Sequence, residues 1–251
     1  MIFRSILFVL AWQLVNNNLN AQLTVTTLKL VRDNEESYSF PLVHSLNSRA
    51  AQKINYYLQK EMLLNDTILT DTNSVFEKSR FIDGTDSLWQ SGLTSMGYEI
   101  EVNSPQVFSL SFEFETMGAY PENYTRYYNF RAQTGARLVA KDLFTPGGIV
   151  ELKKTLKKKR QKRINEWRKE MDTTYNVEND VEYIKETFRE CNAEADEDNF
   201  IIMKNVIVFA KDYCFPHVAR PYDISLDVEF AFRKIERFLS SNGKMLLLQK
   251  H

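Results

Sequence analysis

The sequence predicts an α+β fold in which helices pack on an antiparallel sheet made of a meander and C-terminal hairpin strands. Residues 106–115 alternate apolar and polar side chains, the pattern of a half-buried antiparallel strand. Residues 45–64 and 149–169 carry apolar side chains at steps of three and four, the pattern of an amphipathic helix. Helices that separate groups of hairpin-connected strands are typical of the α+β class.

The first 21 residues have the features of a secretory signal peptide. Arg4 provides a positive charge, residues 5–15 are almost continuously apolar, and Ala21 is a small residue suited to cleavage. This apolar run is much shorter than the ~20 residues of a membrane-spanning helix. We therefore expect an exported protein, periplasmic or extracellular, without a transmembrane segment after leader removal. Because no cysteine stands at the cleavage site, we do not expect a lipoprotein.

The rest of the chain is expected to form two portions packed as one unit. The first, 22–103, holds a strand and a helix, and the second, 104–251, holds the meander, a charged helix pair and the C-terminal strands. The composition, 43% hydrophobic and 26% charged, is that of an ordinary globular protein. The formal net charge of −1 gives no reason to expect a nucleic acid as partner. We expect a monomer.

The N-terminal portion starts with a predicted strand at 23–31, which is rich in β-branched residues. The helix predicted over 45–64 presents one apolar stripe, formed by Leu46, Ala50, Ile54, Tyr57, Leu58 and Met62. Residues 65–92 are polar with weak periodicity. We expect a loop there, with a short strand or helical turn near 75–81.

Three strands, at 106–115, 124–131 and 136–140, are expected to form the meander. The two sides of the first strand differ in polarity, with Phe108, Leu110, Phe112 and Phe114 on one and Ser109, Ser111, Glu113 and Glu115 on the other. We expect helices to cover the apolar side and the polar side to stay available. Gln133-Thr134-Gly135 predicts a turn in which the glycine adopts a positive φ.

A strongly basic helix is predicted after Pro146-Gly147-Gly148, which we interpret as a break. Its basic residues are Lys153, Lys154, Lys157, Lys158, Lys159, Arg160, Lys162, Arg163, Arg168 and Lys169. The next stretch, 170–198, is acidic and has its own apolar stripe, so we expect a helix pair that partly neutralises itself. Solvated helix faces are the favoured interpretation, and a surface for an anionic polymer is the alternative.

The C-terminal part predicts a hairpin of strands 200–203 and 206–210, a strand at 224–230 and a helix at 232–239. Cys191 and Cys214 are the two cysteines of the chain. Export permits a disulfide between them, and the sequence leaves their pairing open.

Several loose motifs, taken in order, resemble a known family. They are Gly-Ala-Tyr-Pro at 118–121, Tyr-Asn-Phe and Thr-Gly within 128–135, Asp-Leu-Phe at 142–144, and Tyr-x-x-Pro-x-x-Ala at 213–219. Residues 23–239 thus resemble the exported domain of unknown function shared by RsiV-like lysozyme-sensing anti-sigma factors and PdaC-like peptidoglycan deacetylases. The resemblance implies a sensor or binding module of the cell envelope. It implies no deacetylase activity, because that activity belongs to a separate domain.

The chain departs from the family pattern at two predicted loops. Tyr120 stands where members often have histidine, and Arg220-Pro221 follow Ala219 where members often have glycine. These departures leave the shared binding specificity open.

The sequence predicts no catalytic, metal or cofactor site. The three histidines are far apart, and Cys214 and His217, the nearest to a nucleophile and its base, are interpreted as a core or disulfide cysteine and a loop histidine. Glu113, Glu115 and Glu122 could supply paired carboxylates. A cell-wall glycan hydrolase is therefore the alternative function.

The stretch GAYPENYTRYYNF at 118–130 contains the predicted binding surface. Tyr124 and Tyr128 share one side of the strand and Tyr127 the other, and some of these rings are expected to cover the phenylalanine-rich neighbouring strand. The residues expected to bind are Tyr120, Glu122, Asn123, Tyr124 and Tyr127. Amphipathic rings beside a charge suit sugar stacking or a protein partner. We expect a non-catalytic exported module that recognises a peptidoglycan-like envelope glycan or a secreted protein such as lysozyme.

Overall fold

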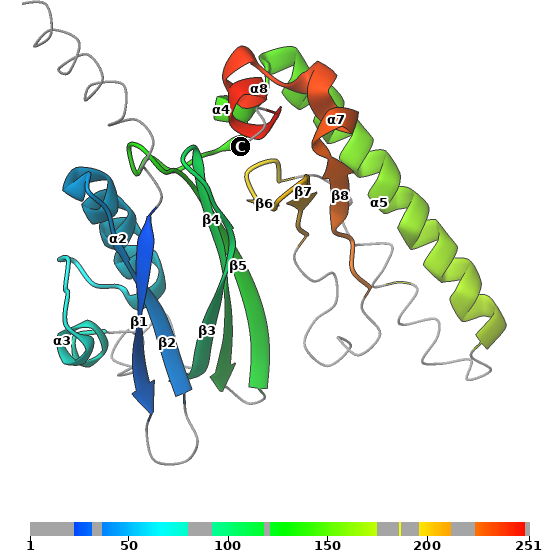
Figure 1. Ribbon diagram of the computed structural model, residues 1–251. Coiled ribbons are helices and arrows are strands. Elements are labelled where there is room, and N and C mark those ends of the chain that lie inside the picture. Colours follow the sequence, from blue (N-terminus) through cyan, green and yellow to red (C-terminus); the bar gives the residue numbers. More distant parts are fainter. Residues whose placement is uncertain are drawn as a thin grey trace, which may run out of the picture. The chain divides into compact units, whose positions relative to one another are not determined.

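The computed structural model describes residues 23–31, 37–79, 92–117, 121–174, 186, 196–211 and 224–248. The chain divides into two compact units, Met1–Arg137 and Leu138–His251, drawn in Figure 1. The boundary predicted at residue 103 falls between two paired strands of the first unit. The predicted signal peptide, Tyr120 and both cysteines lie outside the described residues.

Five strands form the sheet of the first unit. They are β1 (Thr24–Val31), β2 (Ser37–His44), β3 (Gly92–Asn103), β4 (Val107–Met117) and β5 (Pro121–Arg131), side by side in this order. Neighbours run antiparallel except β2 and β3, which pair parallel. The α+β class is confirmed, but the sheet is mixed rather than wholly antiparallel. A parallel pair needs a crossover connection, and this one contains α2 (Ser48–Leu63) and α3 (Thr72–Glu77).

Helix α2 begins after Asn47, whose side chain accepts a hydrogen bond from the backbone N of Ala50 at 3.4 Å and so caps the helix. The predicted apolar stripe is largely confirmed. Its buried members are Ala50, Ile54, Leu58 and Met62. The stripe was wrong for Leu46, which precedes the cap and is 92% exposed.

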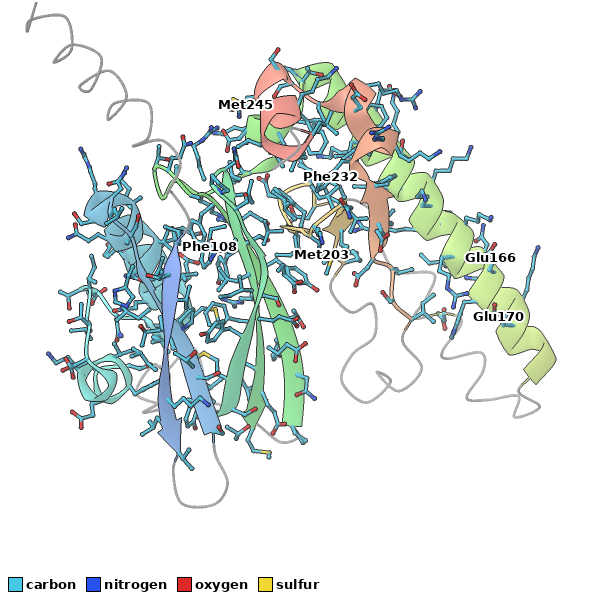
Figure 2. The ribbon with its side chains drawn as sticks, in the orientation of Figure 1. Phe108, Glu166, Glu170, Met203, Phe232 and Met245 are labelled. Carbon is cyan, nitrogen blue, oxygen red and sulfur yellow. The ribbon has the colours of Figure 1, made fainter. Side chains whose placement is uncertain are left out.

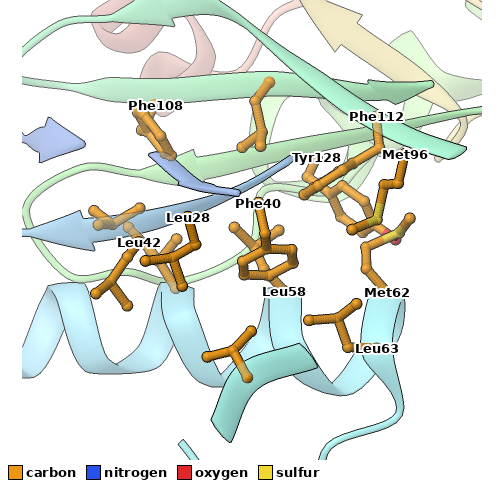
Figure 3. Packing of buried hydrophobic residues seen from close by; sticks show 14 of the residues in the cluster. Leu28, Phe40, Leu42, Leu58, Met62, Leu63, Met96, Phe108, Phe112 and Tyr128 are labelled. Carbon is orange, nitrogen blue, oxygen red and sulfur yellow. The ribbon is translucent and has the colours of Figure 1, made fainter. Parts of the chain in front are cut away.

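The core of the first unit lies between the two helices and the sheet, as Figure 3 shows. The rings of Phe40 and Phe112 meet with centroids 5.6 Å apart. Phe112 also meets the edge of Tyr128 at 5.9 Å, and the Tyr128 hydroxyl donates to Sδ of Met62 at 3.1 Å. The apolar side of β4 is therefore covered by a helix, as predicted.

The meander differs from the prediction in one strand. It consists of β3, β4 and β5, whereas residues 136–140 form no strand and contribute a single bridge between Arg137 and Phe130. The predicted turn is confirmed, because Gly135 has a φ of 66°. A Cβ on Gly135 would also lie 2.3 Å from the carbonyl oxygen of Ala50, so the close approach of α2 requires glycine as well.

The described part of the second unit contains one long helix, a small sheet and short helices. Its elements are α4 (Ala140–Leu143), α5 (Pro146–Thr174), β6 (Phe200–Ile202), β7 (Val206–Phe209), β8 (Val228–Ala231), α7 (Phe232–Ile235), the 3-10 helix η2 (Glu236–Phe238) and α8 (Ser241–Leu248). The strands pair antiparallel in the order β6-β7-β8, and this confirms the predicted hairpin. Helix α8 was not predicted. Most of the predicted acidic helix lies outside the described residues.

Helix α5 begins where the sequence suggested a break. Pro146 occupies its first turn, where a missing N–H costs nothing, and Thr145 Oγ1 accepts from the backbone N of Gly148 at 2.9 Å. None of the described helices is both long and apolar enough to cross a membrane.

Arg160 of α5 is buried, with an exposed fraction of 1%, between the buried residues Leu156 and Ile164 of the same helix. Its Nε donates to the carbonyl oxygen of Leu226 at 3.0 Å, and its Nη2 donates to those of Phe209 and Ala210 at 3.2 and 2.8 Å. The expectation of a solvated basic face was therefore wrong for Arg160, which holds the ends of the small sheet to α5.

Candidate functional site

The pairing of β3, β4 and β5 sorts their side chains onto two faces. Phe114 opposes Tyr124, and Phe112 opposes Arg126, on the side that α2 covers. The opposite side, named here the polar face, carries Ser95, Gly97 and Glu99 of β3, Ser111, Glu113 and Glu115 of β4, and Asn123, Thr125 and Tyr127 of β5. Each strand thus contributes every second residue.

The predicted binding residues are divided between these faces. Tyr124 stacks on Phe114 with ring centroids 5.4 Å apart, and its hydroxyl donates to the carboxylate of Glu122. Both therefore lie on the side of the core. Asn123 and Tyr127 lie on the polar face, where Asn123 is exposed and Tyr127 is half-buried. The structure does not gather these four described residues on one surface.

The polar face is exposed at one end only. Ser109 and Ser111 are buried, which was not expected for the polar side of this strand. The Ser109 hydroxyl donates to Oδ1 of Asn129 at 2.8 Å, so these polar groups are satisfied within the sheet. Glu99, Glu113, Asn123 and Thr125 are exposed. The available part of the face is therefore the part around Glu113.

Two β-bulges in β3 interrupt its pairing with β4, between Leu93 and Ser95 and between Ile100 and Val102. The extra residues, Thr94 and Glu101, both bind across to β4. Thr94 Oγ1 donates to Oε1 of Glu115 at 2.9 Å, and the Ser111 hydroxyl donates to Oε1 of Glu101 at 3.1 Å. Bulges re-aim side chains in this way, and here they fix two carboxylates beside the exposed glutamates.

Gly97 lies between the two bulges and pairs with Glu113. A Cβ built on Gly97 would have no atom within 4 Å, so the sheet has open space above this position. Glycine in the interior of a strand weakens it and often marks the close approach of a ligand or another backbone. The sequence alone assigns no role to Gly97, because it does not predict the strand β3 to which this glycine belongs.

The charge of the polar face is negative. Glu99, Glu113 and Glu115 belong to it, and the carboxylate of the bulge residue Glu101 reaches the same face, where it accepts from Ser111. Arg131 stands six residues beyond Thr125 at the end of β5. In the part of the chain that the structure describes, no group of three His, Cys, Asp or Glu residues could hold a metal ion. The face is suited to binding a cationic or hydrogen-bonding partner rather than a metal.

The structure also shows on which side of the sheet the three glutamates considered for the alternative hydrolase function lie. Glu113 and Glu115 share the polar face, whereas Glu122 lies on the other side of the sheet. Glu122 therefore cannot act with the other two on one substrate bound to either face. The remaining pair includes Glu115, which is held by Thr94.

No protein-family model matches the chain, and no curated protein matches it. The fold has similar solved structures. A crystal structure of a DUF3298 family member from Bacteroides fragilis superposes with a TM-score of 0.58 and 11% sequence identity, over 90% of this chain and 97% of that chain. A DUF3298 family protein from Pseudomonas aeruginosa gives a TM-score of 0.49 and 7% identity, over 88% of this chain and 94% of that chain.

These similar structures are members of a family of unknown function, and the first shows that its fold is shared with this chain. This supports the predicted likeness to a domain of unknown function at the level of the fold. The link to RsiV-like and PdaC-like proteins stays a prediction.

Proposed function

We propose that this chain is an exported, non-catalytic binding module of the cell envelope, and that the polar face is its binding surface. One observation carries the proposal: exposed Glu99 and Glu113 surround the open space at Gly97, with Asn123 and Tyr127 on the neighbouring edge strand. Carboxylates, an amide and a tyrosine on a rigid sheet can bind a partner without a catalytic group. The signal-peptide-like N-terminus and the resemblance to RsiV-like and PdaC-like domains support the envelope location.

The charge favours one of the two expected partners. Four carboxylates on the polar face would repel the carboxylates of peptidoglycan stem peptides and attract a basic protein. We therefore place a basic secreted protein such as lysozyme before a peptidoglycan-like glycan. Association driven by such charges should be faster at low salt.

Binding of the mature chain to lysozyme and to purified peptidoglycan tests the proposal. The double variant Glu99→Gln/Glu113→Gln should weaken lysozyme binding by about tenfold, because it removes two charges from the centre of the face. The matched control is Glu61→Gln/Glu77→Gln, which removes two exposed charges from α2 and α3. Equal affinity of both double variants for lysozyme would refute the polar face as the surface. Binding of neither probe by the wild type would refute the function.

A cell-wall hydrolase remains the competing proposal, now limited to Glu113 and Glu115. Release of soluble fragments from peptidoglycan by the wild type, abolished by Glu113→Gln, would establish the hydrolase and overturn the binding-only function. We expect no release by either protein.

A further inference from the structure

We propose that the outer side of α5 is a second binding site, for a linear polymer that carries phosphate groups. Ten of the 29 residues of α5 are Lys or Arg, and four are Asp or Glu. Lys154, Lys158, Lys162 and Lys169 recur at steps of four, four and seven, and all four are exposed. Residues at these steps lie on one side of a helix, so they form a row about 22 Å long.

The row faces away from the core of the second unit. Leu152, Leu156, Arg160, Ile164 and Trp167 are buried, and they define the inner side of α5. Lys158 lies half a turn away from that side by helical geometry. Lys159, one residue on, instead has its Nζ over the ring of Phe230, 5.1 Å from the centroid. The direction of each lysine is therefore set by its helical position.

The charge of the row is only partly balanced. Lys154 pairs with Glu151 at 2.8 Å and Lys162 with Glu166 at 3.5 Å. Lys157 and Lys158 form no ion pair within the described part of the chain. Glu197 of the acidic stretch pairs with Lys153, which lies nearer the inner side of the helix. Figure 2 shows Glu166 and Glu170 in the C-terminal half of α5, so the half that contains Lys157 and Lys158 is the more positive.

Like charges four residues apart destabilise a helix, so the row has no benefit for the stability of α5 itself. Its spacing suits a chain of anions. From Lys154 to Lys158 and from Lys158 to Lys162 the row rises by about 6 Å along the axis, and each ammonium is a compact charge that binds phosphate well. A membrane surface fits less well, because Leu152, Leu156, Ile164 and Trp167 of α5 are buried in the protein, and the exposed Val150 alone is too little apolar surface to hold the helix in a bilayer.

Fluorescence anisotropy of labelled inorganic polyphosphate with the full chain tests the proposal. The triple variant Lys154→Gln/Lys158→Gln/Lys162→Gln should bind at least about tenfold more weakly at low salt, with a salt slope reduced by about 2 to 3. The control Lys141→Gln/Lys204→Gln/Lys234→Gln removes the same charge from exposed positions of the same unit outside α5. Glutamine keeps the helix propensity of lysine, so folding of α5 should be preserved.

Two further probes distinguish the source of the phosphate. Poly(glycerol phosphate) represents an envelope polymer, and a single-stranded oligonucleotide represents a nucleic acid. Row-dependent binding of poly(glycerol phosphate) supports the proposal and identifies an envelope polymer, whereas row-dependent binding of the oligonucleotide with no binding of polyphosphate or poly(glycerol phosphate) would overturn it. Equal losses in both triple variants, or row-dependent binding to phosphatidylglycerol vesicles with none to polyphosphate, would overturn the proposal. Failure of the wild type to bind polyphosphate and poly(glycerol phosphate) would also overturn it.

Discussion

Asn55 of α2 binds both backbone polar groups of Val43 on β2. Its Oδ1 accepts from the Val43 N at 2.8 Å, and its Nδ2 donates to the Val43 carbonyl oxygen at 2.8 Å. The buried amide of Asn55 thus makes the two hydrogen bonds to the backbone of β2 that a neighbouring strand would make, and it fixes α2 on the sheet. Gln59, one turn later and fully buried, binds the N and O of Leu69 in the same way at 2.9 and 2.7 Å.

Asn55→Asp should lower the free energy of unfolding by about 2–3 kcal/mol at pH 7, because the carboxylate cannot donate to the Val43 carbonyl and is buried. Acidification protonates the carboxylate and restores a donor, so the difference from the control should shrink at low pH. Urea denaturation at several pH values measures it. The control is Gln52→Glu, the same chemical change at an exposed position of α2. Equal stabilities of the two variants at pH 7 would show that the Val43 contacts contribute nothing.

Two adjacent glycines of α5 should respond oppositely to alanine. A Cβ on Gly148 would lie 2.2 Å from the carbonyl oxygen of Phe238, whereas one on Gly147 would have no atom within 4 Å. Gly148→Ala should destabilise the protein by about 1–3 kcal/mol. Gly147→Ala should stabilise it by about 0.5–1 kcal/mol, because alanine loses less entropy in a helix. Thermal unfolding compares them, and a shift of the same sign would contradict the close packing of α5 against η2.

The predicted strand β4 differs from β2 and β3, which the sequence does not reveal, in the regularity of its pattern of apolar residues. Residues 108–115 of β4 alternate apolar and polar side chains, so the two faces of this strand could be predicted from the sequence, although Ser109 and Ser111 are also buried. Strand β3 contains bulges at Thr94 and Glu101, which shift its alternation. In β2 Tyr38, Phe40 and Leu42 alternate with less apolar residues, but one of these is Pro41, and a proline within the run argues against a strand.

The candidate site was predictable in part for the same reason. The alternation along β5 predicted that Tyr124 and Tyr127 face opposite sides, and the register confirms it. The role of Arg160 was not predictable, because its carbonyl partners lie 49 to 66 residues away along the chain. Gly97 could not be recognised as part of the candidate site from the sequence, because this requires knowing that β3 contributes to the polar face.

Arg160 should be the most sensitive basic position of α5. Arg160→Met should destabilise the second unit by about 2–4 kcal/mol, because three carbonyl oxygens lose a charged donor. Arg163→Met removes an exposed guanidinium that pairs with Glu170 at 3.4 Å, and it should change stability by less than about 1 kcal/mol. Chemical denaturation of both variants gives the comparison. A small effect at Arg160 would mean that water or other groups replace it.

Gly97 allows a direct probe of the polar face. Gly97→Arg should fold, because the new side chain enters open space, but it should abolish binding of a basic partner by blocking the face and reversing its local charge. Gly97→Ala is the control, expected to keep the affinity and the stability of the wild type within about 1 kcal/mol. Lysozyme binding that survives Gly97→Arg unchanged would place the binding surface elsewhere.

The hydroxyl of Tyr128 should make stability depend on pH in the alkaline range. Burial, opposed by Arg126, raises the pKa of Tyr128 to about 12 from its usual 10.0. Between pH 10 and about 12 the unfolded chain loses this proton while the folded protein keeps it. The free energy of unfolding should therefore be fully retained below pH 10 and fall above it, by up to about 1.4 kcal/mol per pH unit.

Tyr128→Phe removes the titrating group and should flatten this part of the curve, although it also loses the contact to Met62. Tyr56→Phe, which removes an exposed hydroxyl from α2, is the matched control. Urea denaturation at pH 9 to 12 gives the slopes. If Tyr128→Phe and the control lose stability equally between pH 10 and 12, the alkaline loss arises from other groups, and Tyr128 is ionised in the folded protein as readily as in the unfolded chain.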